Sequence, residues 1–140
     1  LKAAARLKQH EDIKFVIMGS GPLKMQLAMK RDEYVLDNVR LFDTVDKFKI
    51  PGILNDIDIS VIPLRNLELF RGAIPSKIFE SLAMEKPILL GVQGEARELF
   101  IEEGKCGLAF EPENDRDHTF TVHFGADHTL LLPVTINDPY

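Results

Sequence analysis

The stretch that decides the fold is GAIPSKIFESLAMEKPILL, residues 72–90. It opens with a loop that contains glycine and proline. Ser76 then predicts a helix start, because a serine hydroxyl at that place accepts a hydrogen bond from a backbone N–H group. Four apolar residues at helical spacing predict the buried face of this helix: Ile78, Phe79, Leu82 and Ala83. A proline follows Lys86 and ends the helix there, and the apolar run 87–92 predicts a buried strand.

The same stretch predicts a ligand site. A loop that becomes a helix presents free N–H groups and the positive end of the helix dipole to an anion. Lys77 adds a positive charge in the first turn, and Glu80 follows one turn later. These groups suit a ligand with a phosphate at the helix start and a hydroxyl group at the carboxylate. The alternative is that the helix start binds nothing and that Lys77 is a solvated surface lysine.

Short apolar runs alternate with helical patterns on both sides of this stretch. Strands are predicted at 13–18, 39–42, 57–63, 87–92 and 106–110, and helices at 1–9, 23–31, 47–55, 76–86 and 96–103. Such alternation predicts an α/β, Rossmann-like fold with right-handed crossovers and a parallel sheet covered on both faces. Ligands in this class bind at the carboxyl ends of the strands. The longest loop that leaves such an end, residues 63–75, leads into Ser76.

Composition narrows the function classes. The chain has 140 residues, of which 45% are hydrophobic, which is enough for one domain with a core. The net charge of −5 argues against a nucleic-acid partner. The single cysteine, Cys106, excludes an internal disulfide and suits a reducing compartment, so we expect a cytoplasmic location. No apolar run approaches the length of a membrane span.

Two further patterns have more than one explanation. The segment 19–21, Gly-Ser-Gly, lacks the third glycine of the dinucleotide-binding fingerprint, so a tight turn from strand to helix explains it as well as a nucleotide site does. His118, His123 and His128 recur at a spacing of five residues. This spacing favours turn and strand histidines, with a metal site as the lesser alternative.

The segment from Ala3 to Asn114 resembles the C-terminal, donor-binding half of family 4 glycosyltransferases of the GT-B fold. The matching motifs are spread along the chain: GSGP at 19–22, NVRLFDTV at 38–45, DIDISVIP at 56–63, PSKIFESLAM at 75–84, Gly94 with Glu98, and CGL at 106–108 followed by PEN at 112–114. The Pro-Ser-Lys form of the helix resembles bacterial enzymes of surface-polysaccharide biosynthesis.

The resemblance implies roles for named residues. The donor diphosphate is expected at Ile74, Pro75, Ser76 and Lys77, the ribose at Glu80, and the base at Thr44, Val45 and Ile50. Gly19, Ser20, Gly21, Gly72 and Ala73 are expected to form loops beside the donor. No cofactor is expected, because the nucleotide diphosphate sugar is itself the substrate. No metal is expected either, because the N–H groups and helix dipole at Ser76 and Lys77 can stabilise the departing diphosphate.

Two positions depart from the family pattern. The family carries two glutamates, of which the second matches Glu80, while the first falls at Gly72, which has no side chain. A ribose contact therefore carries over to this chain, and the sugar contact by the first glutamate does not. Asp43 stands where the family has glycine, in the loop beside the base.

The implied function is transfer of a sugar from a nucleotide diphosphate sugar to a glycan or lipid-carrier acceptor, with retention of configuration and without a metal. The chain opens in a helical pattern without an initiating methionine. We therefore expect a longer parent with its acceptor domain before Leu1, placed at the periphery of the inner membrane, and we expect this fragment alone to be inactive. A homo-oligomer is one of the alternatives for the oligomeric state. The alternatives are a non-catalytic α/β module that binds a nucleotide or a partner, and a sugar-nucleotide epimerase of the GT-B fold.

The resemblance also divides the chain. Residues 1–114 are expected to form an N-terminally truncated donor-binding domain, and residues 115–140 an atypical tail. The family's central first strand would lie before Leu1, which leaves a gap in the sheet. The alternating segment 119–124 predicts that the tail pairs into this gap. The alternative is that residues before Leu1 supply the strand and the tail lies on the surface.

Overall fold

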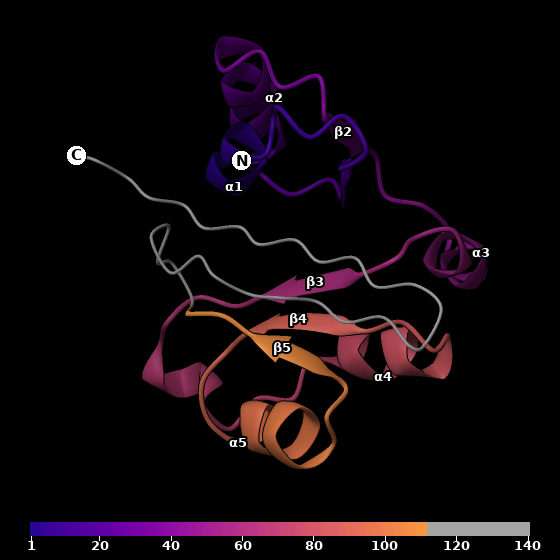
Figure 1. Ribbon diagram of the computed structural model, residues 1–140, viewed down its shortest axis with the longest axis vertical. Coiled ribbons are helices and arrows are strands. Elements are labelled where there is room, and N and C mark those ends of the chain that lie inside the picture. The colour runs from indigo at the N-terminus through magenta and orange to yellow at the C-terminus, as the bar shows by residue number, and fades with distance from the viewer. Residues whose placement is uncertain (112–140) are drawn as a thin grey trace. The chain divides into compact units, whose positions relative to one another are not determined.

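The structure is a computed structural model that describes residues 1–111. The described residues divide into two compact units, Leu1–Ile50 and residues 51–111 (Figure 1). The predictions that fall on the tail, including its strand and its three histidines, lie outside the described residues. Among residues 1–111, no helix is both long and apolar enough to cross a membrane.

The first unit is built around a two-stranded parallel sheet. Its elements are α1 (Lys2–Arg6), β1 (Phe15–Met18), α2 (Lys24–Glu33), β2 (Val39–Phe42) and the 3-10 helix η1 (Lys47–Lys49). The strands pair from Phe15 opposite Val39 to Met18 opposite Phe42. Ala4 of α1 packs with Val39 and Leu36 in a small buried core. The Asn38 amide donates a hydrogen bond of 2.9 Å to the carbonyl oxygen of Ala4, which fixes α1 against the start of β2.

The second unit contains a three-stranded parallel sheet in the order β3-β4-β5. Its elements are α3 (Ile50–Asn55), β3 (Ser60–Pro63), the 3-10 helix η2 (Glu68–Phe70), α4 (Ser76–Ala83), β4 (Ile88–Gly91), α5 (Glu95–Arg97), the π-helix η3 (Glu98–Glu103) and β5 (Gly107–Ala109). The central strand β4 is the most buried, as expected for a strand with a partner on each side.

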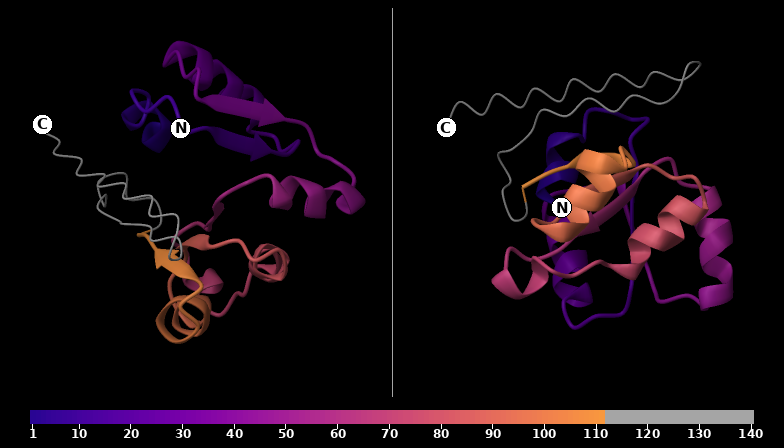
Figure 2. Two further views of the ribbon diagram at one scale, coloured as in Figure 1. Left: turned by 45° about the vertical axis from the view of Figure 1, so that its right-hand side comes forward. Right: turned by 90° about the horizontal axis from the view of Figure 1, so that it is seen from below.

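Helices cover one face of this sheet. Ile62 and Leu90 are register partners, so their side chains share a face, and both belong to the buried core. Ile78 of α4 and Ala96 of α5 complete that core from the helical side. The two helices run beside the three-stranded sheet (Figure 2). Val61, which alternates to the other face, is 52% exposed. Within residues 51–111 the sheet is therefore covered on one face, and the predicted second covering layer is not found there.

The α/β class with parallel strands is confirmed. The described strands form two sheets rather than one, because β1 pairs with β2 only and β3 pairs with β4 only among these residues. A strand inserted between β1 and β3 stays a prediction. The 64–75 segment was predicted as an irregular loop, but it contains η2.

The predicted buried face of α4 is partly wrong. Ile78 is fully buried, as expected, but Phe79 is 55% exposed and Ala83 is exposed as well. Ser81 is buried in their place, because its hydroxyl lies 2.8 Å from the hydroxyl of Ser60 on β3 and 2.8 Å from the carbonyl oxygen of Lys77. The Phe79 ring lies edge-on to the Phe100 ring, with ring centroids 5.6 Å apart.

The end of α4 has a clear physical cause. Glu85 takes a positive φ of 56°, and the Lys86 N–H donates to the carbonyl oxygen of Ser81 at 3.0 Å. This is the Schellman arrangement, in which the N–H of the second residue past the cap closes the last turn of the helix. Pro87 follows and prevents any extension.

Candidate functional site

The start of α4 has no side-chain cap. Pro75 occupies the N-cap position with an extended backbone, and Ser76 is the first helical residue. The prediction that the Ser76 hydroxyl caps the helix is therefore wrong: the cap position falls one residue earlier, on a residue without a hydroxyl. The Ile78 N–H donates to the Pro75 carbonyl oxygen at 3.0 Å. Within residues 1–111, the N–H groups of Ser76 and Lys77 are left without an acceptor.

These free donors are held in a fixed place but open to solvent. Ile78, directly after them, is fully buried in the core of the second unit, and Ile74, before them, is half-buried against it. The side chains of Ser76, Lys77 and Glu80 are all exposed. The helix start therefore combines a rigid backbone with accessible N–H groups, a lysine ammonium group and a carboxylate one turn later.

The loop before α4 is tied to the start of α5. The carbonyl oxygen of Arg71 accepts a hydrogen bond of 3.0 Å from the Glu95 N–H. Gly94 makes this approach possible: its φ is +90°, and a Cβ at this position would lie 2.3 Å from the Arg71 carbonyl oxygen. The guanidinium of Arg71 pairs with Glu68 of η2 at 3.1 Å. The loop is thus anchored a few residues before Ser76.

The position of the family's missing first glutamate is open space. A Cβ on Gly72 would meet no atom of residues 1–111 within 4 Å, and the φ of this residue is not in the left-handed region. The adjacent Ala73 is half-buried and donates its N–H to the carbonyl oxygen of Phe70 at 3.1 Å. A side chain at position 72 is therefore sterically allowed, so the departure from the family pattern is not imposed by local packing.

A shallow hollow, open to solvent, lies near the carboxyl ends of β3 and β4. Its walls come from the 65–71 loop and from Val92 and Gln93. None of the predicted site residues lines it. The hollow and the predicted site therefore differ.

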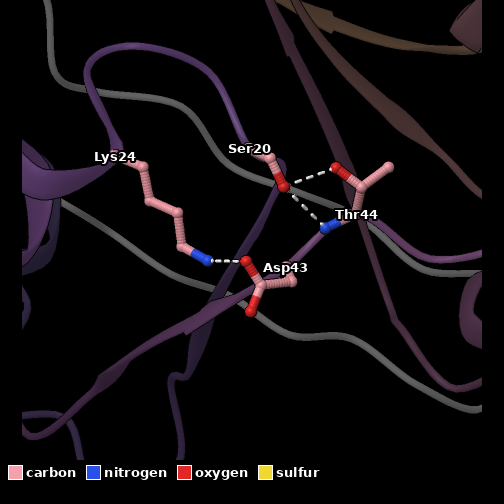
Figure 3. A network of polar contacts seen from close by, with 4 residues as sticks. All are labelled: Ser20, Lys24, Asp43 and Thr44. Atoms are coloured by element: carbon pink, nitrogen blue, oxygen red, sulfur yellow. Dashed lines mark hydrogen bonds and ion pairs between the residues drawn. The ribbon is translucent and has the colours of Figure 1, made fainter.

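The carboxyl ends of β1 and β2 carry a second group of predicted residues. The strand register places Met18 opposite Phe42, and continuing it places Ser20 opposite Thr44. The Ser20 hydroxyl oxygen accepts hydrogen bonds from the Thr44 N–H at 3.2 Å and from the Thr44 hydroxyl at 2.7 Å. Lys24, the first residue of α2, forms an ion pair with Asp43 (Figure 3). The two contacts hold the 43–46 loop against the turn that follows β1.

The far end of this loop is fixed as well. The Asp46 carboxylate caps η1 by accepting a hydrogen bond of 2.9 Å from the Phe48 N–H. Between the two anchors, Thr44 is exposed and Val45 is half-buried, and Ile50 is half-buried at the start of α3. Of the residues predicted in the first unit, Ser20 and Thr44 are thus brought into direct contact. The chain turns into α2 over residues 21–24, where the Lys24 N–H donates to the Gly21 carbonyl oxygen at 3.0 Å.

Sequence reasoning missed Lys24 and Asp46 as parts of this loop structure. The signal for Lys24 was present, because the first residue of a helix after β1 lies near the end of the neighbouring parallel strand, where Asp43 replaces the family's glycine. Asp46 was detectable as a cap, because aspartate before a helical segment is a preferred N-cap. Among residues 1–111, no group of three or more His, Cys, Asp or Glu side chains could hold a metal ion.

Comparison with known protein families identifies the family of this chain. The family described as "Glycosyl transferases group 1" matches residues 1–121, which include both units as the structure describes them and the start of α4. A search of curated proteins finds no match. The family match covers most of the chain and agrees with the parallel α/β architecture and with the loops at the strand ends. The chain therefore belongs to the group 1 glycosyltransferases.

Proposed function

We propose that this chain is the donor-binding half of a family 4 glycosyltransferase that uses a nucleotide diphosphate sugar. The observation that supports this most directly is the uncapped start of α4, with two N–H groups unused within residues 1–111 beside Lys77 and Glu80. Glycosyl transfer in general follows from the family. The identity of the donor, retention of configuration, a glycan or lipid-carrier acceptor and a place in bacterial surface-polysaccharide synthesis belong to the proposal.

The chemistry needs stabilisation of the negative charge that develops on the departing diphosphate. N–H groups and the helix dipole at Ser76 and Lys77 supply it where the charge forms, and pre-organised donors of this kind are among the largest contributions to catalysis. The Lys77 ammonium group adds a positive charge. Ile74 and Pro75, directly before the helix, belong to the proposed diphosphate contact as well. On this proposal the reaction needs no metal.

Glu80 is proposed to bind the ribose. An ionised carboxylate only accepts hydrogen bonds, so it suits neighbouring ribose hydroxyls as donors. Its side chain is exposed, and its place one turn after Lys77 puts it on the part of α4 that a phosphate-bound ligand would extend along. Gly72 and Ala73 belong to the proposed donor loop of the second unit, and Gly19, Ser20 and Gly21 to that of the first.

The base is proposed to lie on the 43–46 loop, over Thr44 and Val45, with Ile50 on its apolar side. The half-burial of Val45 and Ile50 supports this, since each exposes part of an apolar side chain to a flat ring. The acceptor domain is proposed to belong to a longer parent that is cytoplasmic and peripheral to the membrane. On this proposal, residues 1–140 alone bind the donor but do not turn it over.

The first expected result is weak binding of uridine or guanosine diphosphate by the chain. Ser76, Lys77 and Thr44 are each exposed to solvent, so we expect millimolar to micromolar affinity, roughly −4 to −8 kcal/mol. Titration followed by NMR should shift amide resonances of residues 72–80 and 43–46. Shifts confined to other residues would contradict the site assignment.

The second expected result concerns Glu80→Gln. The amide has the same size but cannot offer a charged acceptor, so nucleoside diphosphate binding should weaken by about 1–3 kcal/mol. Isothermal titration calorimetry measures the difference. Glu103→Gln is the matched control, since it makes the same change at an exposed position in η3 and should leave the affinity unchanged. Equal affinities of the Glu80 variant and the control would remove the ribose role.

A further inference from the structure

We propose that Ser20 and Lys24 are positioning residues that lock the 43–46 loop in the conformation that receives the base. The inference rests on the proposed base site and adds two residues that the resemblance does not assign to base binding. Neither Ser20 nor Lys24 needs to touch the nucleotide. They act through Thr44 and Asp43, whose conformations they fix (Figure 3).

The first part of the lock is the double contact between Ser20 and Thr44. One hydroxyl oxygen accepts both the backbone N–H and the hydroxyl of Thr44, at 3.2 Å and 2.7 Å. Two bonds to one residue fix both its backbone and its χ1 rotamer. They also use both hydrogen-bond donors of Thr44, so this residue can meet a base only through its methyl group or as an acceptor, through its hydroxyl or carbonyl oxygen.

The second part is the ion pair between Lys24 and Asp43. Asp43 replaces the glycine of the family, and a free aspartate here would bring an unpaired negative charge beside a ligand that is itself anionic. Lys24 compensates that charge from the first residue of α2. The Asp43 side chain is 83% exposed, so the pair contributes little to the stability of the fold. Its effect is local: it holds the residue next to Thr44 and keeps the loop entrance electrically neutral.

The remaining part of the loop is fixed from the other side by the Asp46 cap of η1. Val45 therefore lies between two anchored residues, Thr44 and Asp46, which restrict the position of its half-buried side chain. A loop held in advance loses less conformational entropy when it binds a ligand, so its affinity for the base is higher. Releasing the anchor at Ser20 should reduce the base contribution and leave other contacts of the ligand unchanged.

The test separates the base contribution from the rest of the ligand. Dissociation constants for uridine and guanosine monophosphates are compared with that for ribose 5-phosphate, which lacks only the base. The preference is the dissociation constant for ribose 5-phosphate divided by that for whichever nucleotide binds more tightly. In Ser20→Ala this ratio should fall about two- to tenfold, the range expected for one or two neutral hydrogen bonds. Hydrogen exchange of the Thr44 amide should become faster in the same variant without any ligand.

Lys24 is tested by charge exchange. Lys24→Asp should reduce the preference for the nucleotide, and the double variant Lys24→Asp with Asp43→Lys should restore it. Lys30→Met, at an exposed position of the same helix, should have no effect. Unchanged Thr44 exchange and unchanged preference in Ser20→Ala would overturn the lock. A wild-type chain without any preference for nucleotide over ribose 5-phosphate would instead contradict the proposed base site, while the exchange measurement would still decide whether the lock exists.

Discussion

Gly94→Ala is expected to destabilise the second unit and to weaken nucleotide binding at α4 at the same time. Gly94 has φ +90° and ψ −145°, a backbone region that is close to glycine-only, and an alanine held there costs about 1–3 kcal/mol. The new Cβ would also lie 2.3 Å from the Arg71 carbonyl oxygen. The obstacle is backbone on both sides, so no side chain can move away to relieve it.

Relief of this contact requires the loop before α4 to move. Separating Gly94 from Arg71 breaks the hydrogen bond of 3.0 Å between the Glu95 N–H and the Arg71 carbonyl oxygen. The loop then loses its anchor just before the N–H donors of Ser76 and Lys77. Urea denaturation should give a lower midpoint, and titration with nucleoside diphosphate should give a lower affinity.

Gly72→Ala is the matched control for this prediction. It adds the same methyl group to the loop that Gly94 contacts, but at a position where no residue among 1–111 lies within 4 Å and φ is outside the left-handed region. Its urea midpoint should stay close to that of the wild-type chain. A Gly94→Ala variant that behaves like Gly72→Ala would show that the contact with Arg71 does not hold the loop.

The sequence carried enough information for the elements but less for their ends. The segment 39–42 was predicted as a strand and is β2 with those same bounds. The strand predicted at 57–63 begins only at Ser60, because its first ladder bond runs from the Ser60 N–H to the Pro87 carbonyl oxygen. A strand begins where a partner offers hydrogen bonds, and local propensity cannot show where that is.

The face of a helix is likewise decided by its neighbour. Helical spacing alone predicted that Phe79 lies on the buried face of α4, whereas the structure buries Ser81. A serine is buried there because Ser60 on β3 and the Lys77 carbonyl oxygen satisfy its hydroxyl, and no sequence pattern foretells that pairing. Periodicity predicts a helix with an apolar stripe, but tertiary contacts decide which face of the helix is buried.

The candidate site was predictable in part for the same reason. The loop-to-helix start at Ser76 follows from local sequence, and its exposure and free N–H groups agree with the expectation. The cap was placed one residue too late, because both serine and proline are common at helix starts and only the backbone angles of Pro75 decide between them. The contact of Ser20 with Thr44 depends on the register of two strands, which lies beyond local pattern.

Ile78→Ala is expected to give the largest loss of stability among single side-chain truncations in α4. Ile78 is fully buried and lies in one core cluster with Ile62, Ile88 and Leu90, so its truncation removes contacts with both β3 and β4. Truncation of a buried isoleucine costs about 2–5 kcal/mol, because lost burial and the remaining cavity add. A domain stable by roughly 5–15 kcal/mol then loses a large part of its margin.

The same residue joins stability to the site, because it immediately follows the two free N–H groups at the start of α4. Ile78→Val removes a single methyl group and should cost about 0.5–1.5 kcal/mol, with nucleotide affinity nearly unchanged. Phe79→Ala, at a half-exposed neighbour, should also cost less than Ile78→Ala even though it removes a larger side chain. Urea denaturation of the three variants ranks these costs. A larger loss for Phe79→Ala than for Ile78→Ala would mean that α4 packs with its other face toward the sheet, and that the N–H groups of Ser76 and Lys77 do not point where the proposed phosphate contact requires.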